Sequence, residues 1–168
     1  MTELIGDFSA AMGLLLAMEI VLSRFLSINA WNIKIGFNFV PVAVAALLYG
    51  PLGGAIVAAM GDFLGAILFP IGPYFPGFTF TAFLTGGVLG LLLHKNPTPV
   101  RIGVAVAVNQ LILGLFLNTF WISTLYGSPF WPLLVTRIVQ CAVLLVVQFV
   151  VIGFIARTLQ RRWKRVTA

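Results

Sequence analysis

Long apolar stretches, separated by short polar or Pro- and Gly-rich breaks, dominate the chain. Most stretches approach the roughly 20 residues that an α-helix needs to cross a bilayer, and Gly–Pro pairs and charge clusters are typical helix ends. The second stretch is short, so we expect it to be tilted, broken or buried. The pattern predicts an all-α membrane protein with six transmembrane helices, at residues 8–26, 37–49, 52–69, 78–93, 100–121 and 133–156.

Composition agrees with this fold class and excludes others. Of the 168 residues, 61% are hydrophobic and 8% are charged, whereas soluble domains carry about 25% charged residues. A soluble enzyme and a separate aqueous domain are therefore excluded, and so is a nucleic-acid binder despite the net charge of +6. We expect residues 1–168 to form a single integral-membrane domain.

Few side chains could carry metal or redox chemistry. Cys141 is the single cysteine and His94 the single histidine, so we expect neither an intrachain disulfide nor a four-ligand zinc site. Glu3 and Asp7 precede the first apolar run, where a cleavable signal would carry Lys or Arg, and we expect this segment to be retained. The sequence contains no paired acids and no nucleophile–base motif, which argues against an intramembrane enzyme.

Lys and Arg are spread unevenly over the predicted loops. Because cytoplasmic loops carry the excess of these residues, we expect both the N- and C-termini in the cytoplasm. On that side fall seven of the ten cations, namely Lys95, Arg101, Arg157, Arg161, Arg162, Lys164 and Arg165.

The other three cations, Arg24, Lys34 and Arg137, fall at the outer side. An Arg in a membrane segment costs about 2.5–3.5 kcal/mol on insertion scales and usually faces the protein interior or a wet cavity. Each side chain could instead reach the lipid headgroups or pair with an acid such as Glu19. Taken together, the three favour a pocket for an anion.

Polar side chains in the fifth and sixth spans point to the same pocket. Polar groups in an apolar helix need partners inside the bundle, and Arg137 and Gln140 lie at a depth that matches the outer part of the fifth span. Asn109 and Gln148 lie deeper and are interpreted as helix–helix hydrogen bonds. One face of the fifth span, at spacings of four, four and three, carries Gln110, Gly114, Asn118 and Trp121.

Aromatic and amide side chains from the outer loops complete the predicted site. Flat heteroaromatic rings stack on Trp, Tyr or Phe, ring amides match Asn and Gln, and carboxylates match Arg and Lys. The predicted ligand is therefore an aromatic, amide-bearing organic anion. The predicted binding residues are Arg24, Trp31, Lys34, Asn38, Tyr74, Asn118, Trp121, Arg137 and Gln140.

Small residues recur every three or four positions in the first and third spans. Such faces let helices pack closely, either within the bundle or against another membrane protein. Asp62 in the third span either pairs with a cation or the backbone, or carries protons in a coupled transporter; no ladder of acids accompanies it, which argues against a proton pump. The two small-residue faces consist of Ser9, Gly13 and Ala17, and of Gly54, Ala58, Gly61 and Gly65.

Three segments resemble the vitamin-binding S components of energy-coupling factor (ECF) transporters. Residues 14–28 (LLLAMEIVLSRFLSI) and 34–39 (KIGFNF) resemble the start of the family, and residues 61–79 (GDFLGAILFPIGPYFPGFT) resemble its folate branch. The resemblance implies a six-helix bundle in the bacterial plasma membrane. Its vitamin site would lie in the outer half, closed by the loop between the first two helices, and the protein would topple to release the vitamin.

The resemblance also implies partners. A membrane coupling (T) subunit and two ATPases would drive uptake, because this chain has no Gly-rich phosphate loop of its own, and folate would be its ligand with no cofactor. The family's Ala-x-x-x-Ala docking motif maps onto Gly13 and Ala17, beside Ser9, with Gly replacing the first Ala. Two alternatives stay open: an S component for pantothenate or thiamine, and a structural membrane subunit without a ligand.

Overall fold

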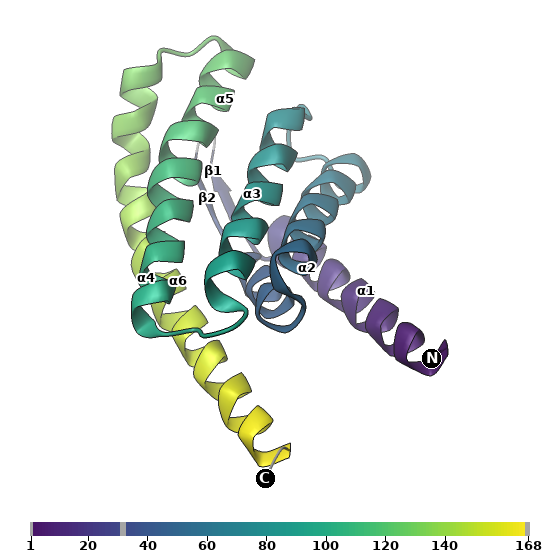
Figure 1. Cartoon of the computed structure of the whole chain (residues 1–168). Helices are drawn as coiled ribbons and strands as arrows, with labels where there is room; N and C mark the ends of the chain where they lie inside the picture. The colour runs from purple at the N-terminus through teal and green to yellow at the C-terminus, as the bar shows by residue number, and fades with distance from the viewer. Residues whose placement is uncertain (1, 31–32, 167–168) are drawn as a thin grey trace.

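Helices make up most of the chain, as its apolar stretches predict (Figure 1). The computed structural model describes residues 2–30 and 33–166, and the side chains of residues 7–27 and 35–161. The elements in chain order are α1 (Thr2–Arg24), β1 (Ile28–Ala30), β2 (Ile33–Ile35), α2 (Phe39–Leu68), α3 (Pro76–Leu93), α4 (Pro99–Ala107), the π-helix η1 (Val108–Leu117), α5 (Asn118–Tyr126) and α6 (Phe130–Val166).

Helix α2 (Phe39–Leu68) is broken at Gly50, next to Pro51, where the sequence predicts a sharp turn between two helical segments. Gly50 has φ +75° and ψ −162°, a conformation that suits glycine, and Pro51 cannot donate the usual bond to the carbonyl of Leu47. The two segments therefore meet at a sharp turn: a Cβ atom on Gly54 would lie 2.9 Å from the Cβ atom of Ala46, whereas these positions would be about 12 Å apart in one continuous helix. Residues 39–49 alone would rise about 16 Å, far short of the roughly 30 Å of a bilayer core.

The prediction of six transmembrane helices is therefore wrong. The described part of helix α1 does not qualify as a span, and it carries the charges of Asp7, Glu19 and Arg24. The number of crossings does not test the cytoplasmic placement of both termini, which stays a prediction. Four helical segments of the described chain are long and apolar enough to cross a membrane: Phe39–Leu68, Pro76–Leu93, Pro99–Tyr126 and Phe130–Arg161.

The segment Pro99–Tyr126 is one continuous helical rod composed of α4, η1 and α5. It begins at Thr98, whose hydroxyl accepts a hydrogen bond from the backbone N–H of Arg101 (3.4 Å), and it ends at the left-handed Gly127. Helix α3 lies between this rod and α2 (Figure 1).

A short antiparallel hairpin, β1 and β2, connects α1 to α2. Ile28 pairs with Ile35, and Ala30 pairs with Ile33. The sequence pattern predicts a loop here, because two three-residue strands are too short to give a periodic pattern. The hairpin sets the distance between the end of α1 and the start of α2.

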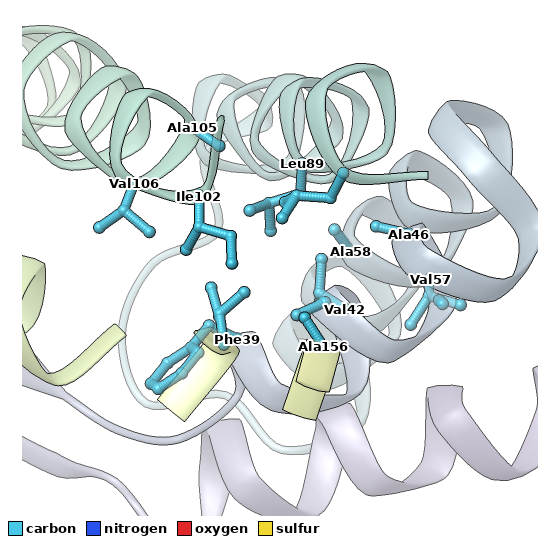
Figure 2. Packing of buried hydrophobic residues seen from close by; sticks show 14 of the residues in the cluster. Phe39, Val42, Ala46, Val57, Ala58, Leu89, Ile102, Ala105, Val106 and Ala156 are labelled. Atoms are coloured by element: carbon cyan, nitrogen blue, oxygen red, sulfur yellow. The ribbon is translucent and has the colours of Figure 1, made fainter. Parts of the chain in front are cut away.

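Buried apolar side chains gather near the end of the bundle where α3 leads into α4 (Figure 2). Val42 of α2, Leu89 of α3 and Ile102 of α4 meet there. Lipid offers no hydrophobic driving force between helices, so close packing must hold them together. Accordingly, a Cβ atom added to Gly86 of α3 would overlap the backbone of Gly54 in α2. The small-residue face of α2 thus packs the bundle from within.

Candidate binding cavity

Beyond the apolar cluster, the bundle contains an open cavity of about 650 Å³. Its floor includes Phe39, Val42 and Ala58, which also belong to the apolar cluster. Its walls come from α1, α2, α3, η1, α5 and α6, so residues far apart in the sequence line one space. The volume lies within the 300–1,000 Å³ typical of small-molecule sites.

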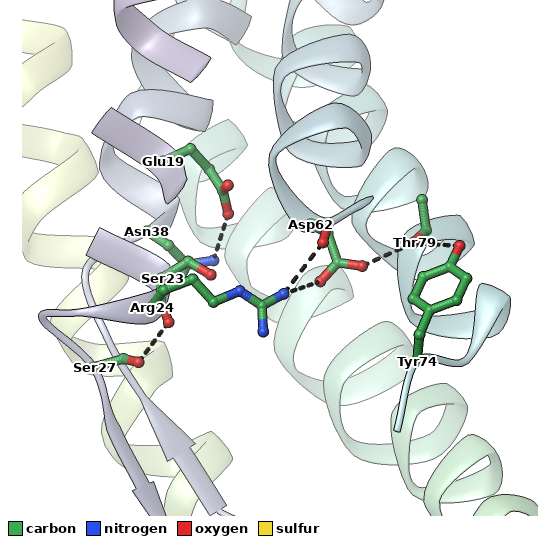
Figure 3. Close-up of polar contacts among 8 residues, drawn as sticks. All are labelled: Glu19, Ser23, Arg24, Ser27, Asn38, Asp62, Tyr74 and Thr79. Atoms are coloured by element: carbon green, nitrogen blue, oxygen red, sulfur yellow. Dashed lines mark hydrogen bonds and ion pairs between the residues drawn. The ribbon is translucent and has the colours of Figure 1, made fainter. Parts of the chain in front are cut away.

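A polar network on one wall joins α1, α2 and α3 (Figure 3). Arg24 Nη2 lies 3.8 Å from Asp62 Oδ1 and donates to the Asp62 backbone carbonyl at 3.2 Å. The Thr79 hydroxyl donates to Asp62 Oδ2 at 2.8 Å, and Tyr74 Oη lies 3.3 Å from Thr79 Oγ1. Asp62 therefore pairs with a cation, one of the two roles predicted for it.

Two glycines of α2 make room for charged side chains of α1. A Cβ atom on Gly61 would overlap the carboxylate of Glu19, and one on Gly65 would lie 2.7 Å from Arg24 Nε. Glu19 is 2% exposed, and its Oε1 accepts a hydrogen bond from Asn38 Nδ2 at 3.4 Å. The small-residue face of α2 thus also lets these polar groups reach the cavity.

The opposite wall presents a cation that no acid neutralises within the described part of the chain. Arg137 of α6 is 6% exposed, and its Nη2 donates to the carbonyl of Gly114 at 3.3 Å. Its Nε and Nη1 have no hydrogen-bond partner among the described residues, and neither does Oδ1 of Asn118. Buried polar groups normally find partners, so these atoms are suited to receive a polar ligand.

The π-helix η1 contributes two amide side chains to the cavity lining. Asn109, Gln110 and Gly114 all line the cavity. Asn109 Nδ2 donates to the carbonyl of Thr85 at 3.3 Å, which agrees with a helix–helix hydrogen bond. Its Oδ1 nevertheless has no partner among the described residues, so Asn109 borders the cavity as well as joining helices.

Aromatic rings lie at the edge of the cavity. Phe75 lines it and packs against the indole of Trp121, with ring centroids 5.5 Å apart. Trp121 Nε1 donates to the Thr81 hydroxyl at 3.0 Å. A Cβ atom on Gly77 would lie 2.6 Å from both rings, so the absence of a side chain there lets them lie against α3.

Most of the predicted binding residues meet in this cavity. Trp121 supports it through Thr81 and Phe75 and is not itself among the lining residues. Trp31 lies outside the described residues, and Lys34 is described only by its backbone pairing with Asn29. The predicted residues that line the cavity are Arg24, Asn38, Tyr74, Asn118, Arg137 and Gln140.

The sequence analysis did not assign several lining residues to the site. Glu19 was interpreted through its pairing and Asp62 through pairing or proton transfer, yet an acid beside closely spaced glycines was a usable signal for the site. Gln148 was interpreted as structural but lines the cavity. Thr81 and Thr85 gave no signal, since threonine is common in apolar helices. Within the described residues, no group of three His, Cys, Asp or Glu side chains could hold a metal ion.

The small-residue face of α1 lies apart from the cavity and is exposed. Ser9, Gly13 and Ala17 are all exposed, and a Cβ atom on Gly13 would meet nothing within 4 Å in the described structure. Further along α1, a shallow groove is lined by Ala17, Met18, Val21 and Leu22. This face is therefore accessible to another protein.

Comparison with known proteins finds similar chains. Residues 8–156 match the family model described as ECF transporter, substrate-specific component. A relative named folate transporter FolT, from Clostridium novyi (strain NT), is 39% identical over 142 residues, covering 84% of this chain and 83% of that protein. Another of the same name, from Leuconostoc mesenteroides subsp. mesenteroides, is 34% identical over 124 residues, covering 72% and 66%.

A solved structure shows the same similarity in three dimensions. It is described as FolT bound with folic acid and superposes on this chain with a TM-score of 0.86 at 30% sequence identity. The match covers 90% of this chain and 93% of the other. The resemblance inferred from the sequence is confirmed.

Proposed function

Because the chain belongs to the substrate-specific components of ECF transporters, we propose that it captures folate from outside the cell for an ATP-driven vitamin importer. Its apolar helices and bacterial relatives place it in a bacterial cell membrane. Relatives named as folate transporters, and a solved relative with folic acid, support folate as the ligand. As a transporter component, the chain supplies binding rather than catalysis.

The chemistry of the cavity supports this ligand. Folate joins a flat pterin ring through an aromatic linker to a glutamate with two carboxylates. Rings can stack on aromatic side chains at the cavity edge, and ring amides can pair with Asn and Gln. The observation that carries the proposal is Arg137, a buried guanidinium with two nitrogens that lack partners among the described residues. It would hold a carboxylate, since charge-assisted Arg–carboxylate bonds are strong.

The proposed contacts extend to the other lining residues that the sequence indicated. Asn118 and Gln140 would bond polar atoms of the ligand beside Arg137, while Asn38 and Tyr74 would contact it from the first wall. Trp121 would act through Thr81 and Phe75. Trp31 and Lys34 remain predicted contacts.

The test is a titration of the detergent-purified chain with folate, followed by tryptophan fluorescence corrected for folate absorbance and by calorimetry. Pantothenate and thiamine serve as control ligands. We expect saturable binding of folate alone, and about 10- to 100-fold weaker binding by Arg137→Gln. Arg101→Gln, an exposed arginine outside the cavity lining, should bind like the wild type. Binding of pantothenate or thiamine instead of folate would show that the chain is an S component for that vitamin. No binding of any of the three would favour a structural subunit without a ligand.

Energy for uptake would come from other subunits. We propose that a membrane coupling subunit docks on the exposed face of Ser9, Gly13 and Ala17, and that two ATPases act through it. Small residues on an exposed helix face permit close helix–helix contact. ATP would then be consumed by the partners, and this chain would need no cofactor.

A further inference from the structure

Asp62 is an acid in a cavity whose proposed ligand is an anion. Its side chain is 23% exposed and lines the cavity, whereas Glu19 on the same wall is 2% exposed. An accessible carboxylate repels the carboxylates of a ligand, so it does not help a site that recognises negative charge alone. The presence of Asp62 is therefore best explained if the carboxylate recognises another part of the ligand, one that donates hydrogen bonds.

The residues around Asp62 hold its carboxylate in place and leave it able to accept further hydrogen bonds. Arg24 Nη2 lies 3.8 Å from Asp62 Oδ1, close enough for the guanidinium to neutralise the charge of the carboxylate. This distance is longer than a direct hydrogen bond. The Thr79 hydroxyl uses one lone pair of Oδ2 at 2.8 Å. An ionised carboxylate offers about four acceptor sites, so both oxygens keep capacity for donors from a ligand.

We propose that Asp62 accepts hydrogen bonds from two adjacent N–H groups at the edge of a 2-amino-4-oxo ring, and so makes the cavity selective for ligands with that donor edge. This inference rests on the proposed function, since the pterin of folate carries such an edge at N3–H and the 2-amino group. Two parallel N–H donors match two carboxylate oxygens in a forked geometry. Arg24 and Thr79 act as positioning residues that hold the carboxylate in place.

A purely structural role makes different predictions. If Asp62 served only to neutralise Arg24, removing both charges together would restore the cavity, because neither would be left unpaired. If Asp62 accepts hydrogen bonds from the ligand, a variant that lacks both charges still binds folate weakly. The loss would also depend on the 2-amino group of the ligand rather than apply to every ligand equally.

The experiment measures dissociation constants by calorimetry for the full chain in detergent. The ligands are folate and a folate analogue in which a methyl group replaces the 2-amino group. The wild type should prefer folate by about 30-fold, the effect of losing a hydrogen bond to a charged group. Both Asp62→Asn and the double variant Arg24→Gln/Asp62→Asn should bind folate weakly and prefer it by less than about 3-fold.

The outcomes separate the two proposals. Wild-type affinity for folate in the double variant, or an unchanged ligand preference in Asp62→Asn, would overturn the role of Asp62 while leaving folate capture intact. A wild-type chain that binds no folate would refute the proposed function itself. The preference is a ratio within one variant, so a reduced folded fraction does not mimic the expected result.

Discussion

Two α2 glycines, Gly61 and Gly65, should be essential for the cavity because they face charged side chains of α1. Alanine at either position introduces a Cβ atom that overlaps the Glu19 carboxylate or lies 2.7 Å from Arg24 Nε. Both charged groups are largely buried and hold defined partners. They cannot move aside without losing those contacts.

The size of the effect follows from a matched control. Gly87 in α3 is also helical, but a Cβ atom there meets nothing within 4 Å in the described structure. Gly87→Ala should stabilise the protein by about 0.5–1 kcal/mol through helix propensity alone. Gly61→Ala gains the same propensity but suffers overpacking of about 1–3 kcal/mol. The difference in the free energy of unfolding between Gly61→Ala and Gly87→Ala therefore measures the cost of the overlap.

The assay is reversible unfolding in mixed micelles at increasing dodecyl sulfate, followed by tryptophan fluorescence, with folate affinity measured on each folded variant. Gly61→Ala and Gly65→Ala should unfold at lower denaturant than Gly87→Ala and bind folate more weakly. Gly87→Ala should bind like the wild type. Equal stability and equal affinity in Gly61→Ala and Gly87→Ala would refute the reasoning.

Two further changes test other parts of the chain. His94 Nδ1 lies 3.0 Å from the Leu47 carbonyl, which has no helical donor because Pro51 lacks a backbone N–H. His94→Phe keeps an aromatic ring but removes this hydrogen bond. The substitution should lower the free energy of unfolding by about 1 kcal/mol. Stability equal to the wild type in the same unfolding assay would exclude this role. Ala17→Leu on the exposed face of α1 should leave folate binding unchanged but abolish ATP-driven uptake into vesicles containing the full transporter; normal uptake would exclude the docking face.

The residues that line the cavity were largely predictable, whereas the number of spans was not. A charge or amide in an apolar helix is costly, so Arg137, Asn118 and Gln140 stood out in the sequence and do line one cavity. Gly50 and Pro51 look like a turn in any sequence. The hydrogen bond between His94 Nδ1 and the Leu47 carbonyl joins that turn to the end of α3, and the contact spans 47 residues. No local pattern reveals it.

The pairing of charges also changes how a mutation of Arg24 must be interpreted. From the sequence, Arg24, Lys34 and Arg137 formed one cationic group around an anion. In the structure Arg24 is matched by Asp62, while Arg137 has no ion-pair partner within the described residues. An Arg24→Ala variant would therefore leave a partly buried carboxylate unpaired, and weakened folate binding would not prove contact between Arg24 and a ligand carboxylate. Arg137 is the position at which loss of binding does argue for such a contact, because its removal leaves no described acid without a partner.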